Sequence, residues 1–111
     1  MTPAEHDTIC ALVSHLPHAL ASVFLQTVMA KREEAVRFGG PSFRDITRIA
    51  GSSPRVWSDI FLTNRRLPEV LRAFVGNLER FLILLESGDA EKMYRFLEEV
   101  ASLKERLHHE P

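Results

Sequence analysis

The stretch of sequence that decides the fold is residues 2–25, TPAEHDTICALVSHLPHALASVFL. It opens with a helix-start pattern, in which Thr2 is the N-cap, Pro3 takes the first helical position and Glu5 completes a capping box. Apolar side chains then recur at alternating steps of four and three residues, at Ile9, Val13, Leu16, Leu20 and Val23. This spacing marks one face of an α-helix. Further apolar residues widen that face, which predicts a helix buried on several sides.

Pro17 interrupts this helix, because proline has no N–H to donate and its ring clashes with the carbonyl one turn earlier. We therefore expect one long N-terminal helix with a kink near residues 14–16. Turn and cap residues divide the rest of the chain into two short helices and a C-terminal antiparallel helix pair. These helices are expected at 43–50, at 54–63, from Leu67 to Gly88, and after the cap Asp89. No segment alternates as a strand does, so the fold class is all-α.

The composition indicates one globular domain over residues 1–111, with 45% hydrophobic and 26% charged residues. No uninterrupted apolar run approaches the roughly 18 residues of a membrane helix. The N-terminus has no basic stretch ahead of an apolar core, which excludes a signal peptide. Cys10 is the only cysteine, so an internal disulfide is impossible and a reducing, cytoplasmic compartment is expected. Secreted and membrane-bound classes are therefore excluded.

Charge is distributed unevenly, although the formal net charge is only −1. Residues 37–72 carry seven Arg, no Lys and three acidic residues, and the segments on either side are acidic. This segment includes a glycine-rich turn, 39–42, whose backbone N–H groups and following helix start favour an anion. Arg44 and Arg48 share one helical face, and Asp45 can pair with one and leave the other for a carboxylate or phosphate. The alternative is that both arginines are solvated.

Two histidines lie one helical turn apart, at His15 and His18, beside the backbone that Pro17 opens. They predict a neutral or switchable donor for a ligand. Alternatives are a hydrogen-bonded core histidine and a zinc site, but no third metal ligand is evident, so no metal is expected. His6 is a third imidazole upstream of this pair, and the alternative is that it is only a solvated side chain of the first turn. The histidines at 108 and 109 are expected to take no part in a site. Trp57 either packs in the core or walls a ligand pocket.

The apolar stripes of the first and last helices exceed what one small domain can cover. Since most soluble oligomers are symmetric dimers, we expect a second copy to cover them in an intertwined homodimer. The alternative is that another domain of a longer parent chain covers these apolar stripes. A second copy and such a domain can also cover them together.

Four motifs occur in order along nearly the whole chain: TPAEHD at 2–7, VSHLPH at 13–18, FRDITRIA at 43–50, and WSDIF at 57–61 with Asn64. Together they resemble the prephenate dehydrogenase family, and more narrowly its C-terminal helical dimerisation domain. The resemblance implies the oxidative decarboxylation of prephenate to 4-hydroxyphenylpyruvate in tyrosine biosynthesis, with NAD or NADP as cofactor. Prephenate and its amino analogue arogenate both remain open as substrates.

In that family an N-terminal Rossmann domain binds the cofactor and supplies the catalytic histidine. The present sequence has no GxGxxG motif and no strand to precede one. We therefore expect no catalytic and no cofactor-binding residue in this chain, and no activity from it alone. It is a domain of a longer protein, a split subunit that needs a separate Rossmann partner, or a degenerate relative.

The resemblance also implies roles for particular residues. His18 would contact the substrate, and Arg48 would pair with a carboxylate of a prephenate-like dicarboxylate. The turn with Pro41 and Ser42 would approach the pocket, in one arrangement from the partner subunit. Supporting residues near the pocket would be Trp57, His6 and His15. Pro41 departs from the glycine run that family members often carry and removes one backbone donor, which Ser42 can replace.

Two other functional classes are alternatives. Residues 45–57 also resemble a helix-turn-helix, but the slightly acidic chain lacks the basic footprint of a DNA-binding protein, so no nucleic acid is expected. A free-standing dimerisation or adaptor module without a ligand is the other alternative. That class predicts that Arg48→Ala leaves every function intact.

Overall fold

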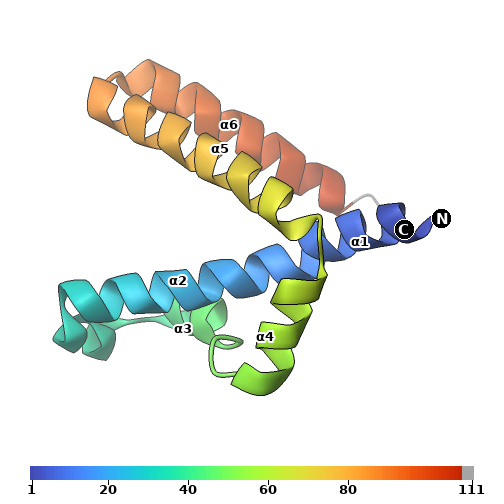
Figure 1. The fold of residues 1–111 in the computed structure, drawn as a ribbon. Helices are drawn as coiled ribbons and strands as arrows, with labels where there is room; N and C mark the ends of the chain where they lie inside the picture. Colours follow the sequence, from blue (N-terminus) through green and yellow to red (C-terminus); the bar gives the residue numbers. More distant parts are fainter. Residues whose placement is uncertain (109–111) are drawn as a thin grey trace. The chain divides into compact units, whose positions relative to one another are not determined.

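The computed structural model describes residues 1–108, and every regular element in that range is helical (Figure 1). In chain order the elements are α1 (Pro3–Cys10), η1 (Ala11–His15), α2 (Leu16–Lys31), η2 (Glu33–Phe38), α3 (Pro41–Thr47), α4 (Pro54–Thr63), α5 (Leu67–Ser87) and α6 (Ala90–Leu107). The predicted all-α class is confirmed. His109 lies outside the described residues. Contacts divide the chain into two compact units, Met1–Arg72 and Ala73–Pro111.

Helix α1 begins with the predicted capping box. The Glu5 N–H donates to Thr2 Oγ1 at 3.1 Å, and the Thr2 N–H donates to Glu5 Oε2 at 3.0 Å. Pro3 takes the first helical position, where its missing N–H is not needed.

The interruption at Pro17 takes the form of a π-helical segment, η1, between α1 and α2. The Leu16 N–H donates to the Ala11 carbonyl, five residues back instead of four. This wider turn comes directly before Pro17, which lies in the first turn of α2 where an N–H is dispensable. At the position of the predicted kink near residues 14–16, the structure has a change in helical pitch over Ala11–His15. Such π segments often occur at functional sites.

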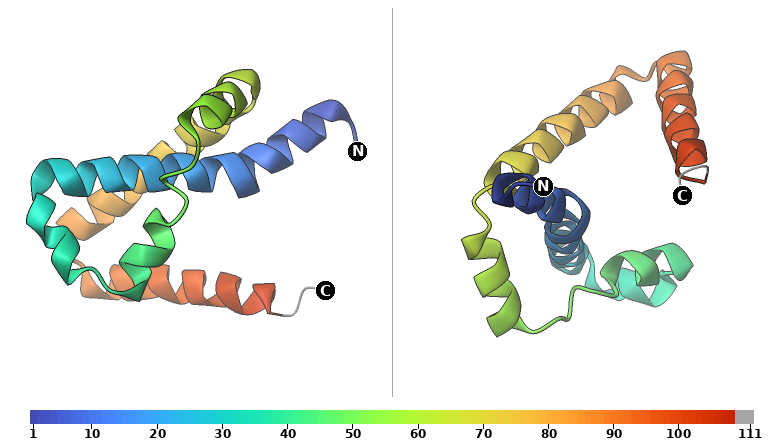
Figure 2. Two further views of the ribbon diagram at one scale, coloured as in Figure 1. Left: turned by 90° about the horizontal axis from the view of Figure 1, so that it is seen from below. Right: turned by 90° about the vertical axis from the view of Figure 1, so that its right-hand side faces the viewer.

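After α2 the chain turns back through the 3-10 helix η2 and brings α3 alongside α2 (Figure 2). Phe24 of α2 packs against Phe43 of α3, with ring centroids 5.9 Å apart. Helix α3 starts two residues before the predicted Phe43, because Gly40 serves as the N-cap and Pro41 as the first helical residue. It also ends at Thr47, earlier than predicted, and a turn follows.

Helix α4 has the predicted bounds, and the Val56 N–H donates to the cap residue Ser53 at Oγ. Residues 48–53 separate α3 from α4. This connection is longer than the turn of about 3–4 residues in a helix-turn-helix, so the geometry disfavours the DNA-binding alternative. Helix α4 instead packs its Trp57 and Phe61 against the start of α2.

Helices α5 and α6 form the predicted antiparallel pair (Figure 1), and the second unit begins within α5, at Ala73. Gly88 has a positive φ of 66°, and Asp89 caps α6 by accepting the Lys92 N–H at 3.0 Å. A left-handed glycine followed by an Asp cap is a typical way to end one helix and begin the next. Phe81 and Phe96 face each other across the pair, with ring centroids 5.6 Å apart.

Apolar side chains are poorly covered throughout residues 1–108. The buried apolar residues in that range are Ala11, Ala21 and Leu67. Large apolar side chains are exposed on α1 to α2, on α5 and on α6, including Val13, Val23, Leu78, Leu82, Val100 and Leu103. This is the apolar surplus that the helical stripes predicted.

The helical stretch Pro3–Lys31 has a mean hydropathy of 1.6 over its most apolar 18-residue window, and 17% of that window is buried. By length and composition it is long and apolar enough to cross a membrane. The exclusion of a membrane helix from the sequence rested on uninterrupted apolar runs and did not take into account the mean hydropathy of this stretch. A core helix of a soluble protein passes the same test, so the stretch is weak support for a membrane span.

Candidate functional site

The predicted residues His15, His18 and Trp57 lie together in the first unit. The His18 imidazole stacks on the Trp57 indole, with ring centroids 3.6 Å apart and an interplanar angle of 11°. His15 approaches the same indole edge-on, at 6.0 Å and 88°, and Phe61 meets His18 at 5.7 Å. We call these four side chains the ring cluster. It joins the π segment and the start of α2 to one face of α4.

His18 is almost fully buried, with 4% of its surface exposed. Burial lowers the pKa of its imidazole below the usual value near 6.5, and the neighbouring His15 lowers it further. The ring is therefore neutral at pH 7, with one nitrogen as donor and the other as acceptor. Neither ring nitrogen has a hydrogen-bond partner among residues 1–108, and no polar side-chain atom there is fully buried without one. Both nitrogens therefore keep some access to solvent or a ligand.

Asn64 completes the cluster, and sequence analysis assigned it no role. It is 7% exposed at the end of α4, and its side chain spans three segments. The Asn64 Nδ2 group lies 3.0 Å from the Asp7 carbonyl oxygen and 3.0 Å from His15 Nδ1. Its Oδ1 accepts the Arg66 N–H at 2.9 Å. Its position in the fourth motif was the available signal, but the partners lie 57 and 49 residues away.

The predicted anion-binding residues lie on α3 and at its ends, and among residues 1–108 they form no hydrogen bond, ion pair or ring contact with the ring cluster. Pro41, Ser42 and Arg48 are all exposed. Arg48 is the C-cap of α3 and forms no hydrogen bond or ion pair with any of residues 1–108. Asp45 pairs with neither arginine there, and Arg44 Nη1 instead donates to the Gly39 carbonyl at 3.4 Å. These residues therefore present the exposed, unpaired guanidinium of Arg48 at the end of α3.

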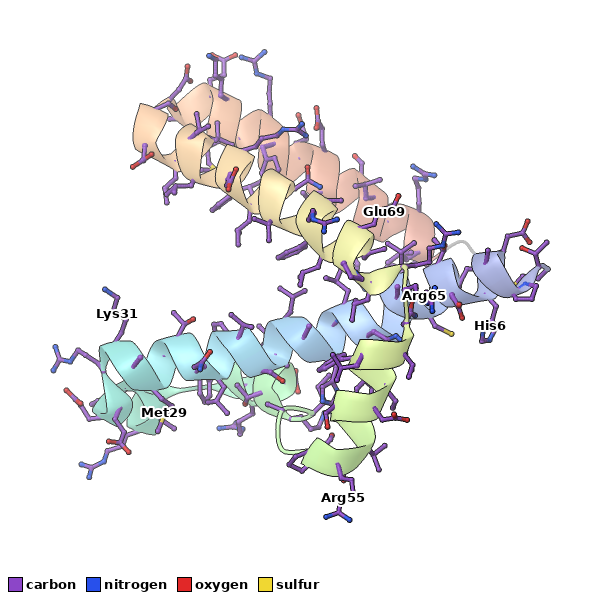
Figure 3. All side chains as sticks on the ribbon, viewed as in Figure 1. His6, Met29, Lys31, Arg55, Arg65 and Glu69 are labelled. Atoms are coloured by element: carbon purple, nitrogen blue, oxygen red, sulfur yellow. The ribbon has the colours of Figure 1, made fainter. Side chains whose placement is uncertain are left out.

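His6 lies outside the ring cluster, on α1 at the end of the helical stretch opposite Met29 and Lys31 (Figure 3). Its side chain is 67% exposed, and Nδ1 lies 4.0 Å from an Asp7 carboxylate oxygen. The Cys10 sulfur lies 3.7 Å from its Nε2. No group of three His, Cys, Asp or Glu side chains that could hold a metal occurs within the described part of the chain.

Comparison with known proteins shows which family the chain is related to. Residues 2–99 match the protein family described as "Prephenate dehydrogenase, dimerization domain". The chain belongs to this family. The resemblance carried by the four sequence motifs is thereby confirmed, and all four lie within the matched range.

Two curated relatives match almost all of this chain. The chain is 33% identical over 111 residues to a prephenate dehydrogenase of Bacillus subtilis, and the match covers 96% of this chain and 30% of that protein. It is 37% identical over 112 residues to a cyclohexadienyl dehydrogenase of Zymomonas mobilis, covering 96% of this chain and 38% of that protein. The chain thus spans about a third of the length of these two relatives.

Solved structures agree with the fold. The prephenate dehydrogenase from A. aeolicus, in complex with hydroxyphenyl propionate and NAD+, is 32% identical with a TM-score of 0.87. The match covers 96% of this chain and 39% of that one. Synechocystis arogenate dehydrogenase has a TM-score of 0.88 at 23% identity, over 96% of this chain and 41% of that one, which supports the fold alone.

Proposed function

We propose that this chain is the dimerisation and substrate-binding half of a prephenate dehydrogenase, and that its two compact units act as one such domain. The observation that carries the proposal is the stacking of the buried His18 on Trp57, beside His15, in a chain of this family. In the reaction proposed, prephenate undergoes oxidative decarboxylation to 4-hydroxyphenylpyruvate on the route to tyrosine. Arogenate is the alternative substrate.

The ring cluster suits an aromatic or cyclohexadienyl ligand with oxygen substituents. Trp57 and Phe61 supply flat apolar faces, and the neutral His18 supplies a donor and an acceptor. The A. aeolicus relative in complex with hydroxyphenyl propionate supports a ligand of this shape and charge. His15 and Trp57 therefore take supporting roles around His18. We also include His6, although its ring lies outside the cluster.

Arg48 is proposed to bind a substrate carboxylate. It is exposed and has no partner of its own among the described residues, so its five N–H donors are available. Arginine suits a carboxylate because the two groups can form two parallel hydrogen bonds. Pro41 and Ser42 at the other end of α3 would complete this anion-binding part, from the same chain or from the partner subunit.

The proposed partner is a second copy of the chain. The family is defined by a dimerisation domain, and exposed apolar faces on α5 and α6 give such a partner something to cover. We extend this to an intertwined homodimer in the cytoplasm. The apolar stretch Pro3–Lys31 would then be covered by protein rather than lipid.

The nicotinamide cofactor is proposed to bind to a separate Rossmann domain, in the same protein or in another subunit. No strand and no Gly-rich strand–helix turn occurs in residues 1–108, so nothing described there suits a dinucleotide. All hydride chemistry would therefore belong to that domain, and the chain by itself would be inactive.

Binding can be tested directly because Trp57 is the only tryptophan. Titration with hydroxyphenyl propionate should change its fluorescence, and Arg48→Ala should weaken the binding. Arg95→Ala is the matched control, since it removes an exposed arginine of α6, a helix that carries none of the proposed site residues. A fluorescence response that is identical in all three proteins, or absent in the unmodified chain, would contradict the proposal.

Catalysis requires a chimera in which this chain replaces the matching part of the B. subtilis enzyme. The chimera should convert prephenate with a nicotinamide cofactor, whereas the 111-residue chain alone should not. Arg48→Ala should lower kcat/KM by roughly 30- to 700-fold, equivalent to about 2–4 kcal/mol, because a charged hydrogen-bonding partner is lost. An unchanged kcat/KM would instead favour the alternative of an adaptor module without a ligand.

A further inference from the structure

Asn64 holds a fixed orientation, although an amide group can in general be turned end for end. One end of its side chain faces the Asp7 carbonyl, which can only accept, and the other faces the Arg66 N–H, which can only donate. The NH2 group must therefore lie toward Asp7 and the oxygen toward Arg66. A reversed amide would oppose two acceptors at one end and two donors at the other.

This orientation decides the state of His15. Asn64 Nδ2 lies 3.0 Å from His15 Nδ1 and already directs its other hydrogen at the Asp7 carbonyl. Its second hydrogen therefore points at His15 Nδ1, which must accept. In a neutral imidazole the proton then lies on Nε2, because the hydrogen bond made by one ring nitrogen sets the state of the other.

We propose that Asn64 is a positioning residue that holds His15 as the tautomer protonated at Nε2, with its ring edge-on to Trp57. His15 then offers one N–H donor to an oxygen of the ligand, beside the His18 ring. This ligand-directed role rests on the proposed function, whereas the tautomer itself follows from contacts within the chain. The amide connects α1, η1 and the start of α5, so it also fixes the π segment next to the ring cluster.

Asn64 also forms the turn into α5, and a purely structural role must be separated from positioning. Asn64→Asp makes this separation, because a carboxylate oxygen still accepts the Arg66 N–H and so keeps the turn. The oxygen that replaces Nδ2 can no longer donate to His15. His15 Nδ1 should then carry the proton, which reverses the tautomer. Asn77→Asp is the matched control, because Asn77 is an exposed asparagine in α5.

The first measurement is ¹⁵N NMR of the two His15 ring nitrogens at a pH where the ring is neutral, with signals assigned through His15→Gln. We expect an unprotonated Nδ1 and a protonated Nε2 in the unmodified chain and in Asn77→Asp, and the reverse in Asn64→Asp. A protonated Nδ1 in the unmodified chain would overturn the proposal without reference to any variant. An unchanged tautomer in Asn64→Asp would overturn it as well.

The second measurement is binding of hydroxyphenyl propionate, followed by Trp57 fluorescence. Asn64→Asp should weaken binding by about tenfold, the effect of one lost hydrogen bond, while Asn77→Asp should not. Reversal of the tautomer with unchanged affinity would overturn the role of Asn64 in ligand binding. If the unmodified chain fails to bind, the proposed function and the donor role of His15 both fail, while the nitrogen signals still decide the tautomer.

Discussion

The His18 imidazole lies nearly parallel to the Trp57 indole, 3.6 Å away and tilted by 11°. This stack joins the start of α2 to α4, and its two residues are 39 positions apart in the sequence. It places a neutral imidazole against the largest aromatic side chain in the protein. Few apolar residues are fully buried in residues 1–108, so we expect this contact to contribute to the stability of the first unit.

Replacement of Trp57 should therefore lower the free energy of unfolding. Trp57→Ala removes the stacked surface and should cost roughly 2–3 kcal/mol, somewhat below a fully buried tryptophan because Trp57 is only partly buried. Trp57→Phe keeps an aromatic face and should cost about 1 kcal/mol. Urea unfolding followed by circular dichroism measures both. Midpoints of both variants equal to that of the unmodified chain would show that the stack contributes little.

Stability should also depend on pH through His18. Its pKa is lowered in the folded chain, mainly by burial and then by His15, so the unfolded chain binds the proton more readily. Stability should therefore be full above the unfolded value near 6.5 and should fall as the pH decreases from there toward the folded pKa. Thermal unfolding across this range measures the effect.

His18→Gln is the matched variant for this pH dependence, because it keeps a polar side chain that does not titrate. It should be less stable at neutral pH and lose less stability on acidification than the unmodified chain. His6→Gln is the control, since it removes an exposed imidazole that lies outside the ring cluster. An acid-dependent loss of the same size in all three proteins would assign the effect to other groups.

Helix ends could be predicted from sequence where a local cap specifies them. Thr2, Ser53 and Asp89 each accept a backbone N–H of the following turn, and all three starts were predicted. Pro17 likewise predicted a break, because its effect depends on the preceding turn alone. The π form of that break was not predicted, since kinked and π-helical accommodations of a proline have the same local sequence signal.

The candidate site was predicted only as separate parts. Residue types identified His15, His18 and Trp57 one at a time, but their meeting depends on how α4 packs against α2. The Asn64 bridge was missed because its partners are a distant carbonyl and a distant ring nitrogen. Arg48 has no partner among residues 1–108, so its predicted role at the same substrate as the rings stays a prediction.

The turn before α3 provides another test of packing. A Cβ atom added at Gly39 would lie 2.7 Å from Phe43 Cδ1, closer than side chains tolerate, and Phe43 packs on Phe24. Gly39→Ala should therefore lower the free energy of unfolding by about 1–3 kcal/mol as Phe43 is displaced. In the control Gly76→Ala, the new Cβ meets nothing within 4 Å inside α5. That variant should be neutral or up to roughly 1 kcal/mol more stable in urea unfolding.

Self-association should depend on one face of α5. Leu71, Leu78, Leu82 and Leu85 recur at helical spacing and form the exposed apolar stripe of α5. Leu78 is 54% exposed, so a glutamate there is tolerated by the single chain but not by a covering partner. Leu78→Glu should raise the dimer dissociation constant at least about 100-fold, because the carboxylate loses its water when the partner docks. Sedimentation over a range of concentrations measures this change.

Ile83→Glu is the control for Leu78→Glu, because Ile83 is also an exposed aliphatic residue of α5, at 67%. Five residues along an α-helix correspond to a rotation of about 140°, so Ile83 points away from the stripe. The Ile83→Glu variant should dimerise as the unmodified chain does. Equal weakening by both variants would mean that the partner surrounds α5 rather than docking on its stripe. A monomeric unmodified chain would instead remove the homodimer from the proposed function and leave the apolar faces to another domain.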